Sequence, residues 1–227
     1  MEDLSVLGAS LNAGAGMDVE RPWSTPTTGG ATSGSNKANQ DLVEDVLRRH
    51  AKSPQPESKR ICKMLQVILD SLEHENIEPK PVALFAALVL ALEGTTKSKD
   101  SAVVVLDQSA LLYLLEEAAN VMPPSAVRLK FSRSVKVVCA VLEARLKDEK
   151  PNTQVLKFGV GSLSNLLCGL EPNNFPSAAA PFTLLLKFVM HGRPKVRKRA
   201  YAGLAKVILA MQDTSALQLA SRTVANL

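Results

Sequence analysis

The sequence predicts an all-α protein built from stacked helical pairs, and three observations favour this fold class. Apolar residues recur at helical spacing through most of the 227 residues, and no segment alternates with the period of two that is typical of a strand. Prolines interrupt the helical stretches at short intervals. Leu, Ala and Val dominate, whereas aromatic residues make up 4% of the chain.

Residues 1–38 are expected to form a disordered, low-complexity tail. Gly, Ser, Thr and Ala are frequent there, so the segment buries too little apolar surface to offset the entropy lost on ordering. Acidic residues and the lack of a basic n-region exclude a secretory signal, and no apolar run reaches the roughly 18–20 residues of a membrane span. We therefore expect no membrane partner and a helical domain over residues 39–227.

The helices of this domain follow one another between proline-rich breaks. Gly94–Asp100 is expected to be a polar loop, the β-branched run Val103–Val105 is a candidate interruption, and Pro151–Thr153 is expected to be a break that contains a helix-capping residue. The apolar stripes place the helices at 42–47, 61–72, 82–92, 101–122, 127–142, 156–167, 177–190 and 193–211, with a last one from residue 214 or 215.

Consecutive helices fall into pairs of about 40 residues, which is the period of HEAT and armadillo repeats. The sequence thus predicts an α-α superhelix, in which a readable repeat signature lies between Pro176 and Met211. The last helix carries no stop signal, and a solenoid needs a polar cap at each end. We therefore interpret residues 39–227 as the N-terminal part of a longer solenoid.

The sequence shows no constellation of catalytic or metal-binding residues. Glu116 and Glu117 are adjacent, so they point to different sides of a helix and are expected on a solvated face. Gly159 and Gly161 lie inside a helical pattern, which favours close helix approach over a phosphate loop. We expect no enzymatic activity, no metal, no cofactor and no small-molecule substrate, since the histidines are far apart and the cysteines isolated: His50, His74, His191, Cys62, Cys139 and Cys168.

The basic segment from His191 to Ala200 is the most informative part of the chain. Gly192 suits a reversal of the backbone, and Pro194 suits the first turn of a helix. Val196 starts the buried face of that helix. Arg197 falls at the edge of this face, so we expect a structural role in which it donates to a carboxylate or carbonyl of a neighbouring helix.

The remaining cations of this segment are candidate partner-binding residues. On a helical wheel, Lys195, Arg199 and Lys206 form one basic stripe beside the buried face, and Lys198 lies near it. Together with Arg193 they match the binding of an RNA backbone or an acidic protein; a nuclear-import signal and simple solubility are the alternatives. A thinner basic set that extends the path is expected after Pro124: Arg128, Lys130, Arg133 and Lys136.

The stretch from about Leu111 to Leu227 resembles the N-terminal helical-repeat region of the ribosomal RNA-processing protein twelve family. The resemblance rests on Leu112–Leu115 leading to Val121–Pro124, on Leu129–Ser132, and on Val155–Lys157 with Ser162–Leu167. The last matching stretch is Leu185–Phe188 followed by Arg193–Ala200, and the Pro-Lys-Val-Arg-Lys turn within it is the most specific part of the match.

The resemblance implies a HEAT-repeat solenoid of the nucleolus and nucleus that shuttles to the cytoplasm in some members. Its expected partners are pre-ribosomal RNA and ribosome-assembly proteins, with transport factors as further partners, and its expected role is a scaffold for rRNA processing and subunit export. HEAT repeats commonly place an Asp before the Pro of the turn, whereas this chain has Arg193, so a cation is expected to be free for a partner. The alternative is a transport-receptor-like or adaptor solenoid that binds acidic proteins.

Overall fold

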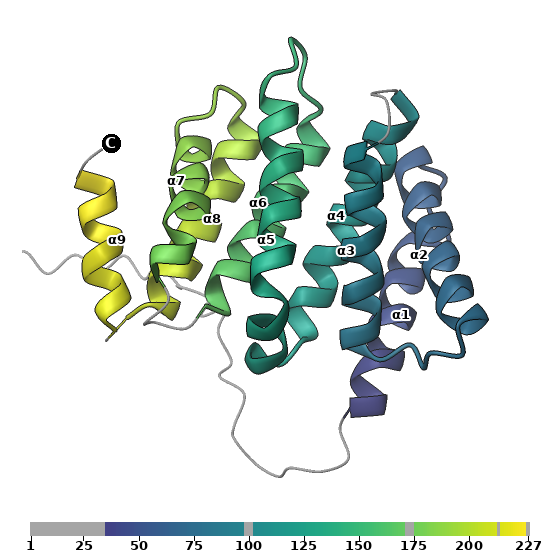
Figure 1. Ribbon diagram of the computed structural model, residues 1–227. Helices are drawn as coiled ribbons and strands as arrows, with labels where there is room; N and C mark the ends of the chain where they lie inside the picture. The colour runs from purple at the N-terminus through teal and green to yellow at the C-terminus, as the bar shows by residue number, and fades with distance from the viewer. Residues whose placement is uncertain (1–34, 98–101, 171–174, 213, 226–227) are drawn as a thin grey trace, which may run out of the picture. The chain divides into compact units, whose positions relative to one another are not determined.

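The computed structural model describes residues 35–97, 102–170, 175–212 and 214–225, with side chains from Leu42 onward. These residues form nine helices and no strand, which confirms the predicted all-α solenoid (Figure 1). The helices are α1 (Ser35–His50), α2 (Pro56–His74), α3 (Pro81–Lys97), α4 (Ala102–Val121), α5 (Pro124–Leu146), α6 (Thr153–Cys168), α7 (Phe175–Val189), α8 (Pro194–Ala210) and α9 (Ser215–Ala225).

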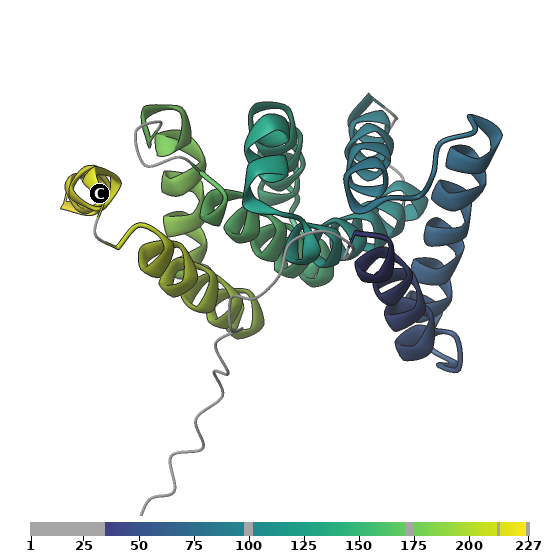
Figure 2. The same cartoon turned by 90° about the horizontal axis from the view of Figure 1, so that it is seen from below.

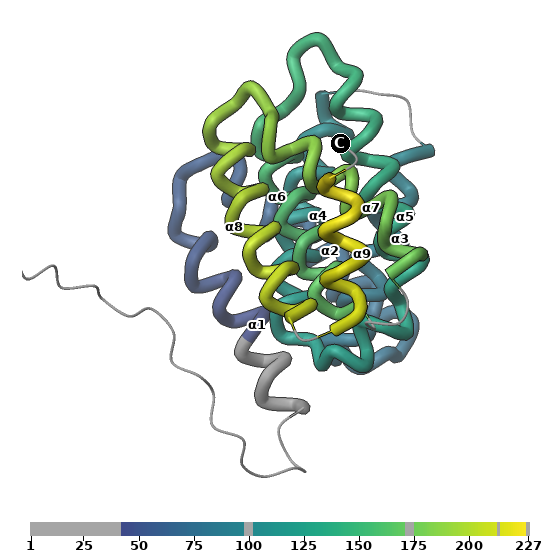
Figure 3. The backbone as a smooth tube through the Cα atoms, turned by 90° about the vertical axis from the view of Figure 1, so that its left-hand side faces the viewer, coloured from purple at the N-terminus to yellow at the C-terminus, as the bar shows by residue number. Residues whose placement is uncertain are grey.

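Within Ser33–Leu227, the helices from α3 onward form two layers. The even layer contains α4, α6 and α8, and the odd layer contains α3, α5, α7 and α9 (Figure 2). Each even helix packs on the preceding odd helix, so α3–α4, α5–α6 and α7–α8 are successive pairs. At the N-terminal end, α2 packs against α1, α3 and α4. An end-on view separates the two layers (Figure 3).

Proline starts several of these helices, because its fixed φ suits the first turn and its missing N–H is not needed there. Pro56, Pro124 and Pro194 each occupy the first turn of α2, α5 and α8. The capping residue predicted within Pro151–Thr153 is Asn152, whose Oδ1 accepts from the N–H groups of Gln154 and Val155 at 2.9 and 3.2 Å at the start of α6.

A continuous apolar core runs between the two layers and joins all nine helices. The most enclosed large side chains include Phe85 of α3, Leu112 of α4, Leu142 of α5 and Phe182 of α7. Helices in the middle of the stack, such as α4 and α6, pack against four or five others, so contacts between successive pairs contribute to the stability of the stack. None of the described helices has the length and hydropathy that crossing a membrane requires.

Several expected boundaries are wrong. Helix α1 begins at Ser35 rather than 39, and the rest of the predicted disordered tail lies outside the described residues. Helix α3 continues through Gly94 to Lys97, so most of the expected loop is helical. Helix α4 is uninterrupted at Val103–Val105, because its packing on α3 and α6 outweighs the lower helix propensity of β-branched residues.

Candidate nucleic-acid interface

The turn between α7 and α8 positions the basic segment. Arg193 is the N-cap residue of α8 with extended backbone (φ −85°, ψ 121°), and Pro194 opens the helix. Val196 and Ala200 are fully buried, as their spacing predicts. Gly192 was expected to supply special backbone angles, but its φ lies outside the left-handed region and a Cβ there would meet open space. The turn therefore tolerates other residues at 192.

Arg197 has a structural role and donates to carbonyls, as the sequence predicts, but its acceptors lie in the α7–α8 turn rather than in a neighbouring helix. Its Nη1 donates to the carbonyl oxygens of His191 and Gly192 at 2.9 and 3.1 Å. These carbonyls follow the last turn of α7, where backbone acceptors lack helical partners. Arg197 thus ties the first turn of α8 to the end of α7.

Arg193 is not the free cation that the sequence suggested. Its Nη1 donates to the carbonyl oxygen of Pro151 and to the hydroxyl of Thr153, both at the start of α6. Its own N–H donates to Nδ1 of His191 at 3.1 Å. In place of an Asp–Arg ladder, this repeat uses an arginine that holds the α7–α8 turn against the preceding repeat.

His191 precedes the turn and acts in it as a hydrogen-bond acceptor. Its Nδ1 accepts the Arg193 N–H, so the ring is in its neutral form. Burial and the neighbouring charges of Arg193 and Arg197 lower the pKa of His191. The ring therefore fixes the turn as a hydrogen-bonded neutral group.

Arg199 is committed to an ion pair across the even layer. Its Nη2 pairs with Oε1 of Glu116, a residue of α4 whose side chain is 7% exposed. Glu116 reaches Arg199 by crossing α6 at Gly161, where a Cβ would lie 2.4 Å from the carboxyl carbon. The expectation that Glu116 lies on a solvated face is therefore wrong, and the expectation that Gly161 permits close helix approach is confirmed.

Lys206 continues this polar contact along the same side of α8. Its Nζ donates to Oδ1 of Asn165 in α6 at 2.7 Å and to Oδ1 of Asn120 in α4 at 3.2 Å. Asn165 in turn donates from Nδ2 to the carbonyl of Glu116 at 3.1 Å. We call this set the polar seam: Glu116, Asn120, Gly161, Asn165, Arg199 and Lys206.

The two lysines of the basic turn differ from its arginines. Lys195 and Lys198 are exposed, and among the described residues neither makes an ion pair or side-chain hydrogen bond. Both line a groove of about 840 Å³ between the N-terminal halves of α6 and α8, which we call the α6–α8 groove. Its described lining contains no carboxylate: Thr153, Gln154, Lys157, Arg193, Pro194, Lys195, Lys198, Arg199 and Ala202.

Lys157 also belongs to this groove, although the sequence patterns do not single it out. It lies one turn beyond the Asn152 cap of α6, and its Nζ sits 4.9 Å from the centroid of the Phe158 ring. The cation–π contact supports the ammonium without neutralising it. The signal in the sequence is weak, since a single lysine after a cap has no charged neighbours that would mark it.

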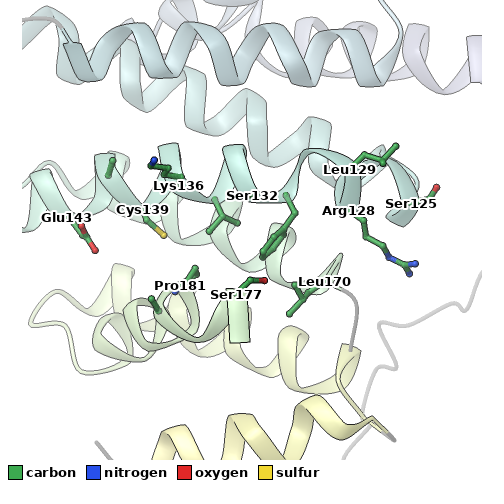
Figure 4. Close-up of a pocket in the computed structure, with 14 residues that line it drawn as sticks. Ser125, Arg128, Leu129, Ser132, Lys136, Cys139, Glu143, Leu170, Ser177 and Pro181 are labelled. Atoms are coloured by element: carbon green, nitrogen blue, oxygen red, sulfur yellow. The ribbon is translucent and has the colours of Figure 1, made fainter. Parts of the chain in front are cut away.

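The second basic set does not extend the path of α8, because α5 lies in the odd layer (Figures 1 and 2). Arg133 turns toward α3, where its Nη2 lies 2.7 Å from Oε2 of Glu93. This hydrogen bond and the charge of Arg133 lower the pKa of Glu93. Arg128 and Lys136 line a different groove, between α5 and α7 (Figure 4).

Within the described part of the chain, no three His, Cys, Asp or Glu side chains gather to hold a metal ion. Desolvation raises the pKa of Cys139 to about 12 and also raises the pKa of Cys62 and Cys168. These thiols are therefore protonated at neutral pH and act as small apolar side chains.

Comparisons with known proteins agree with the resemblance. Residues 30–227 match the family described as RRP12-like, N-terminal HEAT repeats. The RRP12-like proteins of Homo sapiens and Gallus gallus are each 26% identical to the chain over 164 residues, which cover 71% of this chain and 12% of the relative. The chain thus spans about an eighth of the length of these relatives. No solved structure matches it. The chain belongs to the RRP12-like family of HEAT-repeat proteins, which is associated with ribosome biogenesis.

Proposed function

We propose that the chain is a non-enzymatic scaffold segment for ribosome biogenesis, whose α6–α8 groove binds the phosphate backbone of pre-ribosomal RNA. Membership of the RRP12-like family supports the biological setting, and with it a nuclear and nucleolar location and a role in rRNA processing and subunit export. The groove supplies the physical basis for the contact with RNA.

The observation that carries this proposal is the pair of exposed lysines, Lys195 and Lys198, in a groove whose described lining has no carboxylate. A phosphate backbone needs several cations at helical spacing and no base-reading geometry. Lys157 adds a third cation from the opposite wall. The N-terminus of α8 also lies at this groove, and the dipole of the helix favours an anion there.

Arg193, Arg199 and Lys206 have a different part in this proposal. Their donors engage the Pro151 carbonyl that precedes α6 and hydroxyl, amide and carboxylate oxygens of α4 and α6, so they hold the walls of the groove in place. The walls are set before RNA arrives, which reduces the entropy lost on binding. Bound RNA then gains affinity mainly through counterion release at the lysines.

Recovery of ribosomal precursors with the tagged chain tests the proposal. Lys195→Ala with Lys198→Ala is expected to reduce the recovered precursor rRNA severalfold, while Lys130→Ala with Lys136→Ala removes the same charge from the odd layer and is expected to leave recovery unchanged. Far-ultraviolet circular dichroism confirms that all variants fold. Equal recovery by both double variants contradicts an RNA contact at the α6–α8 groove.

A further inference from the structure

A second pocket of the even layer has no part in the proposed function. It has a volume of about 450 Å³ and is lined by the first residues of α2 and α6 and by the first half of α4. Gln154 of α6 lines both this pocket and the α6–α8 groove, so the two lie next to each other. We call it the Glu57 pocket.

Two buried oxygen atoms of this lining have no hydrogen-bond partner among the described residues. They are Oε1 of Glu57 and Oγ of Ser109, whose residue is 4% exposed. The other carboxylate oxygen of Glu57, Oε2, accepts from Nε2 of Gln154 at 3.1 Å, and this bond fixes the carboxylate at the wall of the pocket. Folded proteins pair the great majority of buried polar atoms, because an unpaired one costs stability. The two oxygens therefore point to a ligand that donates hydrogen bonds.

The charge of the pocket is negative and comes from Glu57. Arg60 also lines the pocket, but it is paired with Asp107, whose Oδ1 lies 2.5 Å from Nη2 and 2.6 Å from Nε of the guanidinium. Nearby His50 is neutral, since burial and the charge of Arg49 lower its pKa. No described cation pairs with Glu57, so a cationic ligand fits this pocket better than an anion.

The rest of the lining suits the stem of a long side chain. Leu106 of α4 is 48% exposed, and Pro56 and Ala110 add further apolar surface. Arginine combines an apolar stem with a planar guanidinium that carries several N–H donors in a fixed fork. One guanidinium thus serves acceptors on two different helices, whereas the ammonium of lysine is a compact point charge without such a fork.

We propose that the Glu57 pocket binds an arginine side chain of a partner protein. The guanidinium pairs with Oε1 of Glu57 and donates to Oγ of Ser109, while its stem packs against Leu106. A nucleobase fits less well, because the described lining contains no aromatic ring on which a base stacks. This inference goes beyond the proposed function and does not depend on it.

Subtractive selection from a phage-displayed library of random peptides tests the proposal, with the full chain as bait. Peptides that bind the Glu57→Gln chain are removed first, so the retained peptides depend on the carboxylate. They are expected to share one arginine. Fluorescence anisotropy with synthetic, fluorescein-labelled copies then measures their affinity. Citrulline in place of this arginine keeps the shape without the charge and is expected to weaken binding at least 10-fold, and lysine about threefold.

Variants of the chain locate the contact. Ser109→Ala removes an unpaired buried hydroxyl, so it is expected to fold and to weaken peptide binding about threefold. Leu106→Lys places a cation at the exposed edge of the pocket and is expected to weaken binding about 10-fold. Glu73→Gln removes the same charge as Glu57→Gln from an exposed position at the other end of α2 and is expected to change the affinity less than twofold. Far-ultraviolet circular dichroism confirms that each variant folds.

The proposal is overturned if the selection retains no peptide that depends on arginine, or if the citrulline peptide binds as tightly as the arginine peptide. It is also overturned if Ser109→Ala and Leu106→Lys leave the affinity unchanged. A loss of RNA-hairpin binding in Glu57→Gln as large as its loss of peptide binding contradicts the proposal too, because the pocket then reads a base. Unchanged RNA binding in Glu57→Gln supports a protein ligand that is separate from the α6–α8 groove.

Discussion

The even and odd layers are built from the same helical pairs, yet their helices meet in different ways. In the even layer, glycines let α4, α6 and α8 approach closely, and the polar seam links them: a Cβ on Gly203 of α8 would lie 2.0 Å from Oγ of Ser164 in α6. In the odd layer, α5 and α7 leave an open groove along about five turns of α5. The comparison indicates that the even layer sets the geometry of the stack, whereas α5 and α7 pack against each other less closely.

Breaking the seam at its ion pair gives the largest expected effect on stability. Arg199→Ala leaves the buried carboxylate of Glu116 without its cation, which is expected to lower the free energy of unfolding by about 2–3 kcal/mol, less than for a fully buried pair because Arg199 is 39% exposed. Urea denaturation followed by circular dichroism measures the loss. Adding Glu116→Gln removes the stranded charge and is expected to restore at least half of it.

The matched change in the odd layer is Arg133→Ala, which removes one of the two cations that pair with the partly exposed Glu93 and leaves Lys97 as the other. Exposed ion pairs contribute little to the free energy of unfolding, because water and salt screen their charges. The comparison between layers is wrong if Arg133→Ala destabilises the chain as much as Arg199→Ala.

Filling the space beside a glycine of the even layer has the next largest expected effect on stability. Gly203→Ala places a methyl group against Ser164 and is expected to cost about 1–3 kcal/mol, because the side chain or the helices must shift. Gly94→Ala in α3 of the odd layer is the control, since a Cβ there meets nothing within 4 Å. That change is expected to stabilise the chain by about 0.5–1 kcal/mol through helix propensity. A lower melting temperature for Gly203→Ala and a higher one for Gly94→Ala support the comparison between layers. A stabilising Gly203→Ala contradicts it.

The sequence alone predicts most of the architecture and less of the site. Prolines and apolar stripes locate the helices, and the position of Arg197 at the edge of a buried face predicts its contact with a carbonyl. The burial of Glu116 depends on Gly161, 45 residues later, and on Arg199 beyond it, so no local pattern indicates it. The carbonyl of Pro151 that accepts from Arg193 has no sequence signature, because every residue carries a carbonyl.

The smallest expected effect is on the pH dependence of stability. Burial, followed by the charge of Arg49, lowers the pKa of His50, which hydrogen-bonds Tyr113 of α4 at 2.9 Å, and burial likewise lowers the pKa of His191. Both histidines are therefore neutral in the folded chain at pH values where the unfolded chain binds protons. Their contribution is present above about pH 6.5 and is lost as the pH falls below it.

Urea titrations at pH 7.5 and 5.5 measure this contribution. His50→Gln with His191→Asn keeps polar groups at both positions but removes the titration, so the double variant is expected to lose less stability than the unmodified chain between the two pH values. An equal or larger loss in the double variant contradicts neutral histidines at these two positions.

The salt dependence of RNA binding tests most directly the claim that some cations of α8 stabilise the fold whereas others bind RNA. Anisotropy titrations with a fluorescein-labelled RNA hairpin, at several salt concentrations, give the slope of log K against log salt. Lys195→Ala with Lys198→Ala is expected to reduce the magnitude of this slope by about 2, roughly one for each phosphate that is no longer neutralised, while Lys130→Ala with Lys136→Ala leaves it unchanged. Equal slopes for both double variants would contradict the account.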